Sequence, residues 1–330
     1  KEQVRAGVAA ARHQLRRGLR RYVVRSAILG LAAAIRINPM ARPSRHGIRI
    51  DKDLRYGDAT GAHSLDVFVP TQATGPLPVV FYVHGGGFSM LSKDTHWGMA
   101  MAFARRGYLV FNINYRLAPK SVFPAALEDV CAAFEWMVEH APGYGGDLQR
   151  LVLAGESAGA NLVTALTVAT TFERAEPYAA RVFATEVVPK AVVPACGILQ
   201  VTDIERFWRR RPLPSWLRAM LTDVSSGYLG DVSVMPSAEL ELADPLRVLE
   251  GDDEPRRALP RFFVPVGTRD PLLDDSRRLA RALGHRDIPC MVRYYEGEVH
   301  AFHAFVWREQ ARECWSEKFA FLDAVLAADV

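Results

Sequence analysis

Short apolar segments alternate with helix-like segments along most of this 330-residue chain, and this alternation limits the fold more than any other feature. Several of the apolar segments are continuous, as expected for strands that are buried on both faces of a sheet. Strands that alternate with helices favour a mostly parallel sheet with helices on both sides. The sequence therefore predicts an α/β protein with a mostly parallel central sheet.

The predicted elements follow one another in a regular order. Two early segments alternate apolar and polar residues and predict an antiparallel start to the sheet: His46–Leu54 and His63–Val69. Six further strands are predicted: Pro78–Val83, Tyr108–Asn114, Arg150–Ala154, Lys190–Leu199, Arg261–Val266 and Met291–Tyr295. Helical patterns predict four helices between or after them: Ala125–Glu139, Ala158–Thr170, Asp274–Leu283 and Phe305–Ala327.

One stretch interrupts this order. Residues 203–254 contain no clear buried strand but carry several large apolar side chains, among them Trp208, Trp216 and Met220. We expect this stretch to fold over the sheet as a helical cap, with an N-terminal helical segment as its partner. The expected organisation is an N-terminal cap segment (1–46), a core (47–202), a cap insertion (203–254) and the C-terminal part of the core (255–330).

Positive charge is concentrated at the N-terminus. Residues 1–46 contain one lysine and ten arginines but a single acid, Glu2, whereas the whole chain has a formal net charge of only +4. Apolar residues recur at every fourth position there and predict an amphipathic helix: Leu15, Leu19, Val23, Ala27 and Leu31. Such an arm is either a solvated helix face or a contact surface for anionic membranes or nucleic acid.

Other bulk features narrow the class of protein. No apolar run reaches the roughly 18–20 residues that span a bilayer. The four cysteines form no C-x-x-C pair and their spacing fits no zinc site. A chain of this size needs no disulfide bonds to fold, so we expect reduced thiols and a cytoplasmic location.

The motif G-x-S-x-G occurs once, at Gly155–Gly159, with Ser157 at its centre. A predicted buried strand runs directly into it and an apolar helix runs directly out of it. This strand–turn–helix context is typical of a nucleophile elbow, in which a sharp turn projects the serine hydroxyl away from the sheet. The alternative is a serine that only caps a helix beside two turn-forming glycines.

A second glycine-rich segment, His84-Gly85-Gly86-Gly87-Phe88, follows the predicted strand Pro78–Val83. Three consecutive glycines allow the backbone to approach a ligand closely, with exposed amides that can stabilise a developing oxyanion. We expect the amides of Gly86, Gly87 and Ala158 to form an oxyanion hole. A phosphate loop is the alternative, but neither G-x-G-x-x-G nor a Walker lysine is present.

Together these motifs resemble the bacterial branch of the hormone-sensitive lipase family of esterases, which has the α/β-hydrolase fold. The resemblance extends from about Val67 to the C-terminus. Further matching segments are Tyr115–Pro119 followed by Phe123–Ala126, Gly267–Leu272, and His300–Phe302. Two positions depart from the family pattern: Lys120 replaces a glutamate, and Ala301 replaces the glycine after the histidine.

The resemblance implies a catalytic triad in the order serine, acid, histidine, which Ser157, Asp270 and His300 satisfy. Asp270 follows the predicted strand Arg261–Val266, and carboxyl ends of parallel strands are where α/β sheets bind ligands. The rivals are Asp274 and Asp275, which we interpret as helix N-terminal charges, and His303, which we interpret as a supporting or surface histidine.

Other polar residues near the motifs are assigned weaker roles. We expect His84 to hold the glycine loop by hydrogen bonding and Glu156 to make a buried polar contact beside the elbow. Asp244 is interpreted as part of a turn. Asp94, His96 and Trp97 either border the pocket or cap the next helix.

The resemblance implies a carboxylesterase that hydrolyses short- to medium-chain acyl esters through an acyl-enzyme, with no cofactor or metal. We expect a small-molecule ester substrate and no nucleic-acid partner. Weak membrane-surface contact through the N-terminal helix and a homodimer stay open. The alternative functions are a membrane-docked lipase, an amide or acetyl-sugar hydrolase on the same triad, and a non-catalytic binding protein.

Overall fold

The computed structural model describes residue 30 and residues 42–59, 61–209, 212–231 and 237–327. The predicted amphipathic helix of the N-terminal arm lies almost entirely outside these residues. Within them, no helix combines the length and the apolar character that crossing a membrane requires.

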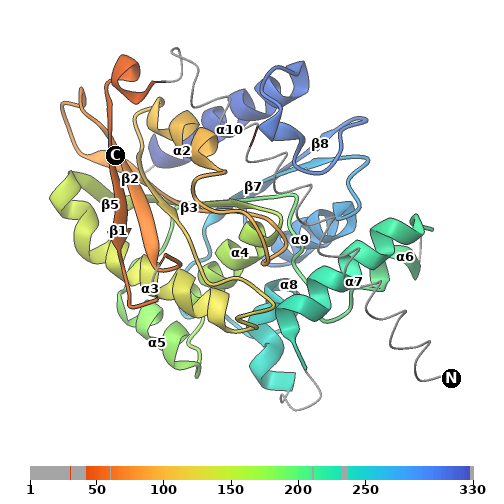
Figure 1. The fold of residues 1–330 in the computed structure, drawn as a ribbon. Helices are drawn as coiled ribbons and strands as arrows, with labels where there is room; N and C mark the ends of the chain where they lie inside the picture. The colour runs from red at the N-terminus through yellow and green to blue at the C-terminus, as the bar shows by residue number, and fades with distance from the viewer. Residues whose placement is uncertain (1–29, 31–41, 60, 210–211, 232–236, 328–330) are drawn as a thin grey trace, which may run out of the picture.

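An eight-stranded sheet forms the centre of the molecule, in the spatial order β1-β2-β4-β3-β5-β6-β7-β8 (Figure 1). The strands are β1 (Ile48–Arg55), β2 (Ser64–Pro70), β3 (Leu77–Val83), β4 (Leu109–Ile113), β5 (Gly146–Glu156), β6 (Ala191–Ala195), β7 (Arg261–Gly267) and β8 (Cys290–Tyr295). Strand β2 pairs antiparallel with β1 and β4, and all other pairs are parallel. All eight predicted strands are confirmed, including the antiparallel start.

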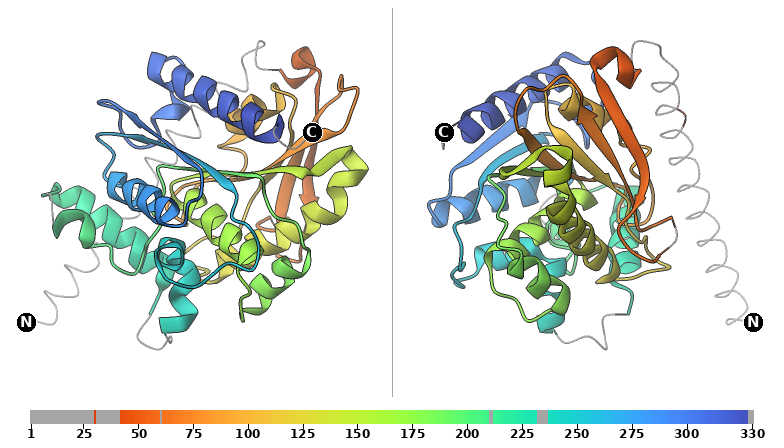
Figure 2. Two further views of the ribbon diagram at one scale, coloured as in Figure 1. Left: turned by 180° about the vertical axis from the view of Figure 1, so that it is seen from behind. Right: turned by 90° about the vertical axis from the view of Figure 1, so that its left-hand side faces the viewer.

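Helices cover both faces of the sheet (Figure 2). One face carries α2 (Trp97–Ala104) and α10 (Glu309–Ala327), and the other carries α3 (Ala125–His140), α4 (Ala158–Thr171), α5 (Pro177–Ala184), α8 (Pro245–Glu250) and α9 (Leu273–His285). Strand β3 shows why both faces need cover: Val79 and Phe81 join one apolar core, whereas Val80 and Tyr82 join the other. A strand whose successive side chains are all apolar must be buried on both sides.

Three predicted boundaries were wrong by four residues, and one of them is the start of β5, at Gly146 rather than Arg150. Strand β6 ends at Ala195 rather than Leu199, because Cys196 adopts a positive φ of 41° and turns the chain away from the sheet. Helix α10 begins at Glu309 rather than Phe305, because Ala301 has a φ of 55° and a short 3-10 turn, η6 (Phe302–Ala304), follows it. Helix α5 was not predicted.

The stretch 203–254 contains no strand among its described residues. It forms α6 (Arg206–Arg209), α7 (Ser215–Leu229), the 3-10 helix η5 (Ser237–Ala243) and α8.

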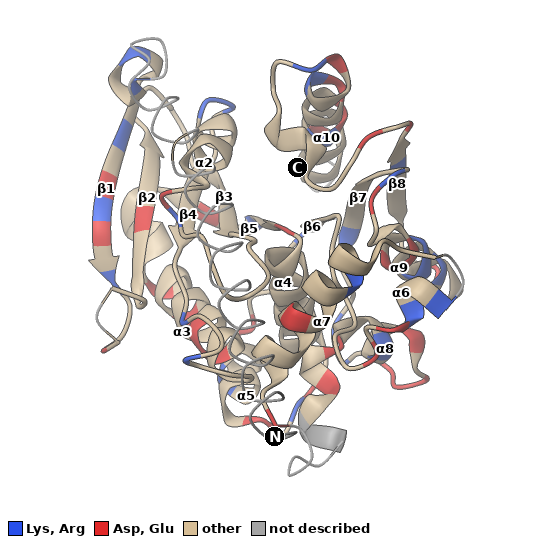
Figure 3. Ribbon diagram, turned by 45° about the vertical axis from the view of Figure 1, so that its right-hand side comes forward, with Lys and Arg blue, Asp and Glu red and all other residues tan. Residues whose placement is uncertain are grey.

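Two further 3-10 helices lie outside this stretch: η2 (Pro43–His46) precedes β1, and η3 (Ala141–Tyr144) precedes β5. Figure 3 shows charged residues along the edge strand β1 and on the outer helices α9 and α10, whereas the central strands lie inside the molecule.

Candidate active site

Ser157 lies at the sharp junction between β5 and α4. Its backbone has φ 56° and ψ −116°, a region that non-glycine residues seldom occupy. The flanking glycines allow this turn: a Cβ on Gly155 would lie 2.6 Å from the carbonyl oxygen of Gly159, and one on Gly159 would lie 2.2 Å from that of Val83. The strain is therefore held by close backbone packing, and the serine stands at the positive end of the α4 dipole.

The glycine loop after β3 packs against this turn. A Cβ on Gly85 would lie 3.4 Å from Ser157 Cβ, and Gly86 and Gly87 have φ values of 115° and 56°. Among the hydrogen bonds between described residues, none uses the amide of Gly86 or Gly87 as donor. Ala158 is the first residue of α4, so its amide also has no acceptor within the helix. The amides of the three predicted oxyanion donors thus donate no hydrogen bond within the described part of the chain.

Asp270 and His300 are hydrogen bonded. His300 Nδ1 lies 2.8 Å from Asp270 Oδ2, and the other carboxylate oxygen accepts the Leu272 amide at 2.8 Å. The Asp270 side chain is fully buried, whereas the His300 side chain is 35% exposed. Burial opposes the charged imidazolium, but the neighbouring Asp270 carboxylate outweighs it and raises the pKa of His300 well above its ordinary value. The imidazole is thus oriented and made more basic by Asp270.

Sheet topology brings these residues together at the carboxyl ends of the parallel strands. Ser157, Asp270 and His300 follow the carboxyl ends of β5, β7 and β8, which lie in one half of the parallel sheet. Strand β6 lies between β5 and β7, and the carbonyl oxygen of Ala195 at its end accepts the Ser157 amide at 3.0 Å. The three predicted triad residues therefore share the edge at which α/β sheets bind ligands.

Glu156, the residue before the serine, holds the glycine loop in place through hydrogen bonds. Its carboxylate accepts the Gly85 amide at 2.7 Å, pairs with His96 Nε2 at 2.5 Å and accepts a short hydrogen bond from the Tyr82 hydroxyl. Burial would raise the pKa of Glu156, but the charge and hydrogen bond of His96 outweigh it, and the pKa lies far below its ordinary value. The predicted buried contact of Glu156 is confirmed. His96 is also the N-cap residue of α2, as one of the two predicted alternatives had it: its carbonyl oxygen accepts the Met99 amide at 2.9 Å, while its ring pairs with this carboxylate.

The other two candidate histidines are buried, and burial lowers the pKa of each. His84 Nδ1 lies 2.7 Å from the carbonyl oxygen of Gly85, and the ring stacks on Tyr115 with centroids 4.3 Å apart. Burial lowers the pKa of His84 to about 3 and that of His303 to about 3. Both rings are therefore neutral at ordinary pH. The contacts of His84 agree with a role in holding the glycine loop.

Helix α7 presents an apolar stripe that ends at the glycine loop. Val224 Cγ2 lies 2.8 Å from where a Cβ on Gly87 would stand. Met220 and Trp216 precede Val224 at intervals of four residues and therefore lie on the same helix face. Their exposed fractions are 46% and 55%. An apolar surface thus leads from solvent to the candidate oxyanion hole.

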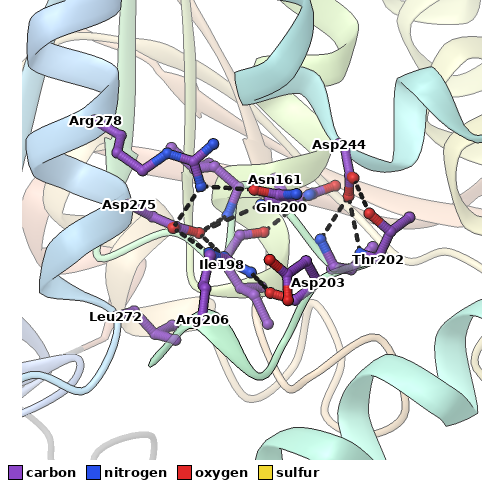
Figure 4. A network of polar contacts seen from close by, with 12 residues as sticks. Asn161, Ile198, Gln200, Thr202, Asp203, Arg206, Asp244, Leu272, Asp275 and Arg278 are labelled. Carbon is purple, nitrogen blue, oxygen red and sulfur yellow. Dashed lines mark hydrogen bonds and ion pairs between the residues drawn. The ribbon is translucent and has the colours of Figure 1, made fainter. Parts of the chain in front are cut away.

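Two buried carboxylates hold the turn after β6, and the sequence did not reveal them. Asp275 was predicted to be a helix N-terminal charge, but it is fully buried, accepts the Leu199 amide at 2.8 Å and forms an ion pair with Arg206 (Figure 4). Asp244, predicted to lie in a turn, accepts the Val201 amide at 2.6 Å. Asp275 therefore joins α9 to the turn after β6 and to α6 rather than serving as a catalytic acid.

Comparisons with known proteins agree with this geometry. A family model described as the alpha/beta hydrolase fold matches residues 80–304. The chain is 31% identical to esterase LipI of Mycobacterium tuberculosis over 238 residues, which cover 71% of this chain and 67% of that protein. It is 29% identical to an acetyl esterase of Salmonella schwarzengrund over 255 residues, covering 75% and 70% of the two chains. The solved structure of a bacterial heroin esterase superposes with a TM-score of 0.74 at 22% identity, covering 92% of this chain and 91% of that one.

The chain therefore belongs to the α/β-hydrolase family, in its hormone-sensitive-lipase-like bacterial esterase branch. It is a carboxylic ester hydrolase, that is, a carboxylesterase. Its substrate is accordingly a small-molecule ester.

Proposed function

We propose that Ser157, Asp270 and His300 hydrolyse the ester through an acyl-enzyme. His300 removes the Ser157 hydroxyl proton as the oxygen attacks the ester carbonyl, and returns that proton to the departing alkoxide. Water then attacks the acyl-enzyme with His300 again as base, which releases the acid and restores the serine. Asp270 orients the ring and stabilises its cation. No step requires a metal or cofactor.

The amides of Gly86, Gly87 and Ala158 stabilise the oxyanion of both tetrahedral intermediates. The helix dipole of α4 acts in the same direction. Removal of one such donor in serine hydrolases costs on the order of 10²–10³ in turnover. The positive φ values of Gly86 and Gly87 set the direction of their amides, so the contribution of this hole depends on the glycine conformations described above.

One observation carries this proposal: His300 and Asp270 are hydrogen bonded at 2.8 Å. They lie at the carboxyl ends of parallel strands, as the strained Ser157 does. The apolar stripe Val224–Met220–Trp216 further supports esters with short to medium acyl chains, since such a chain can lie along α7 while the carbonyl oxygen points to Gly86 and Gly87. We propose on this basis that 203–254 acts as a cap over the site. The N-terminal segment 1–46 is its proposed second part.

Hydrolysis of p-nitrophenyl esters of graded chain length tests the assignment. Ser157→Ala should lower kcat/KM by about 10⁴ or more, as loss of a serine nucleophile does elsewhere. Ser316→Ala, at an exposed serine in α10, should leave the rate unchanged. Labelling by a fluorophosphonate should add one adduct, at Ser157. An alanine variant that keeps wild-type activity would contradict the proposal.

Met220→Ala examines the acyl site separately. Because Met220 is exposed, its truncation should not unfold the chain. We expect KM to rise for the longer acyl chains and to change little for acetate. Equal effects on all chain lengths would place the acyl chain elsewhere.

Two further proposals concern partners and location. Strand β8 lies at the sheet edge with Met291 and Tyr294 exposed, and supports a homodimer, which light scattering after size exclusion would detect. The charge of residues 1–46 supports weak binding to anionic membranes, and co-sedimentation with phosphatidylserine vesicles at low salt tests it. The four cysteines are free, which supports a cytoplasmic location.

A further inference from the structure

Cys196 lies within the candidate active site, although its position in the sequence gave no such indication. It follows β6 directly and is 1% exposed. Its sulfur, an oxygen of Asp270 and a nitrogen of His300 all lie within 4.8 Å of one another. Of the described residues, no other group of three or more histidine, cysteine or acidic side chains is arranged in this way.

These three side chains offer three of the four ligands that a thiophilic divalent cation such as zinc takes. Zinc binds cysteine sulfur at about 2.3 Å and histidine nitrogen at about 2.0–2.1 Å, which places the ligand atoms of a tetrahedral site about 3.5 Å apart. The atoms in this site need shifts on the order of 1 Å to reach that spacing. Thiolate and imidazole favour zinc or cadmium over magnesium or calcium, which prefer oxygen ligands.

The surroundings also leave a route for the ion. Cys196 and Asp270 are almost completely buried, but the His300 side chain is 35% exposed. A cation can therefore meet His300 first and then reach the two inner ligands. Three protein ligands leave the fourth zinc position for water, as in open zinc sites.

We propose that zinc binds reversibly to Cys196, Asp270 and His300 and thereby inhibits this hydrolase. On binding, the Cys196 thiol releases its proton to solvent and its sulfur bonds to the metal, with no change of oxidation state. The metal also separates His300 from Asp270, so the imidazole can no longer act as base. The inhibition rests on the proposed triad, whereas the binding does not.

Zinc titration of ester hydrolysis tests the inhibition. We expect wild-type enzyme to lose activity on zinc addition and to recover it with EDTA. Cys196→Ala and Cys196→Ser should each require at least about tenfold more zinc for half-inhibition, relative to their own metal-free rates. Cys290→Ser is the matched control, because Cys290 lies in β8 outside the cluster, and it should respond as wild type does.

Binding is measured independently of activity with cobalt(II) as a probe. Ser157→Ala should develop the near-ultraviolet thiolate-to-cobalt absorption band, and the double variant Ser157→Ala/Cys196→Ala should not. Zinc should also raise the Tm of wild type more than that of Cys196→Ala, since a ligand that binds the folded state stabilises it. Equal zinc sensitivity of wild type and both Cys196 variants would overturn the proposal, as would a cobalt band that survives loss of Cys196.

The two proposals fail in different ways. A cobalt–thiolate band in a chain that hydrolyses no ester would leave the metal site intact and refute the triad. Ester hydrolysis that depends on Ser157, without any cobalt–thiolate band, would refute the metal site alone.

Discussion

Replacing Glu156 by glutamine should loosen the attachment of the glycine loop to the nucleophile turn. Three donors converge on this carboxylate: the Gly85 amide, the His96 ring and the Tyr82 hydroxyl. Glutamine retains similar size but loses the negative charge and replaces one acceptor oxygen with a donor. The loop that carries the candidate oxyanion amides then loses its charged anchor.

The magnitude follows from the type of hydrogen bond. Bonds to a charged group contribute about 1.5–3 kcal/mol each, and neutral ones about 0.5–1.5 kcal/mol. Converting three bonds from charged to neutral therefore lowers the free energy of unfolding by about 3–4.5 kcal/mol. The effect on turnover should appear in kcat with little change in KM, because the loop amides act on the transition state.

The pH dependence of this loss can be derived. The pKa of Glu156 is lowered, so its stabilisation is present above its ordinary value of 4.5 and is lost as pH falls through the folded pKa. Burial would lower the pKa of His96, but Glu156 outweighs it and raises that pKa. The His96 contribution is therefore complete below 6.5 and is lost as pH rises through the folded pKa. The difference between wild type and Glu156→Gln should be largest between about pH 4.5 and 6.5.

Urea unfolding at pH 5.5 and pH 9, with p-nitrophenyl butyrate kinetics at each pH, measures both effects. Glu139→Gln, at an exposed position on α3, is the control and should change the free energy of unfolding by less than about 0.5 kcal/mol. A destabilisation of the same size at both pH values would refute the charged pair. Unchanged kcat in a destabilised variant would refute the link to the glycine loop.

Two further substitutions, the second paired with a control glycine, test the site geometry. Asp270→Asn removes the charge that raises the pKa of His300, so the rising limb of the pH profile of kcat/KM should move to lower pH. The maximal rate should fall by up to about 10⁴. A pH–rate profile with an unshifted limb would contradict this. Gly159→Ala places a Cβ 2.2 Å from the backbone oxygen of Val83 and should cost about 3 kcal/mol or more in urea unfolding. Gly98→Ala, where nothing lies within 4 Å, should instead stabilise α2 by up to about 1 kcal/mol, and equal effects at the two glycines would undermine the packing argument.

Local sequence determined the framework of this protein. Continuous apolar runs such as Pro78–Val83 predict strands that are buried on both faces, because a strand with one face in water would expose half of its apolar side chains. The glycines around Ser157 were equally informative. The Gly159 carbonyl, four residues away, requires Gly155, whereas Gly159 is required by the Val83 carbonyl on the adjacent strand, so the motif signals the turn but β3 completes the requirement.

Only the tertiary structure showed which side chains lie next to the triad and which hold the turns around it. Cys196 and Asp275 are ordinary residues in the sequence, and only the parallel order of β5 to β8 brings Cys196 to Asp270 and His300. Asp275 lies in the first turn of α9, where an acid usually interacts with the helix dipole, yet its partner is Arg206, 69 residues away in the chain. The reason is physical: periodicity and turn chemistry act over a few neighbouring residues, whereas the charge and hydrogen bonding of a buried group depend on whatever the fold packs against it.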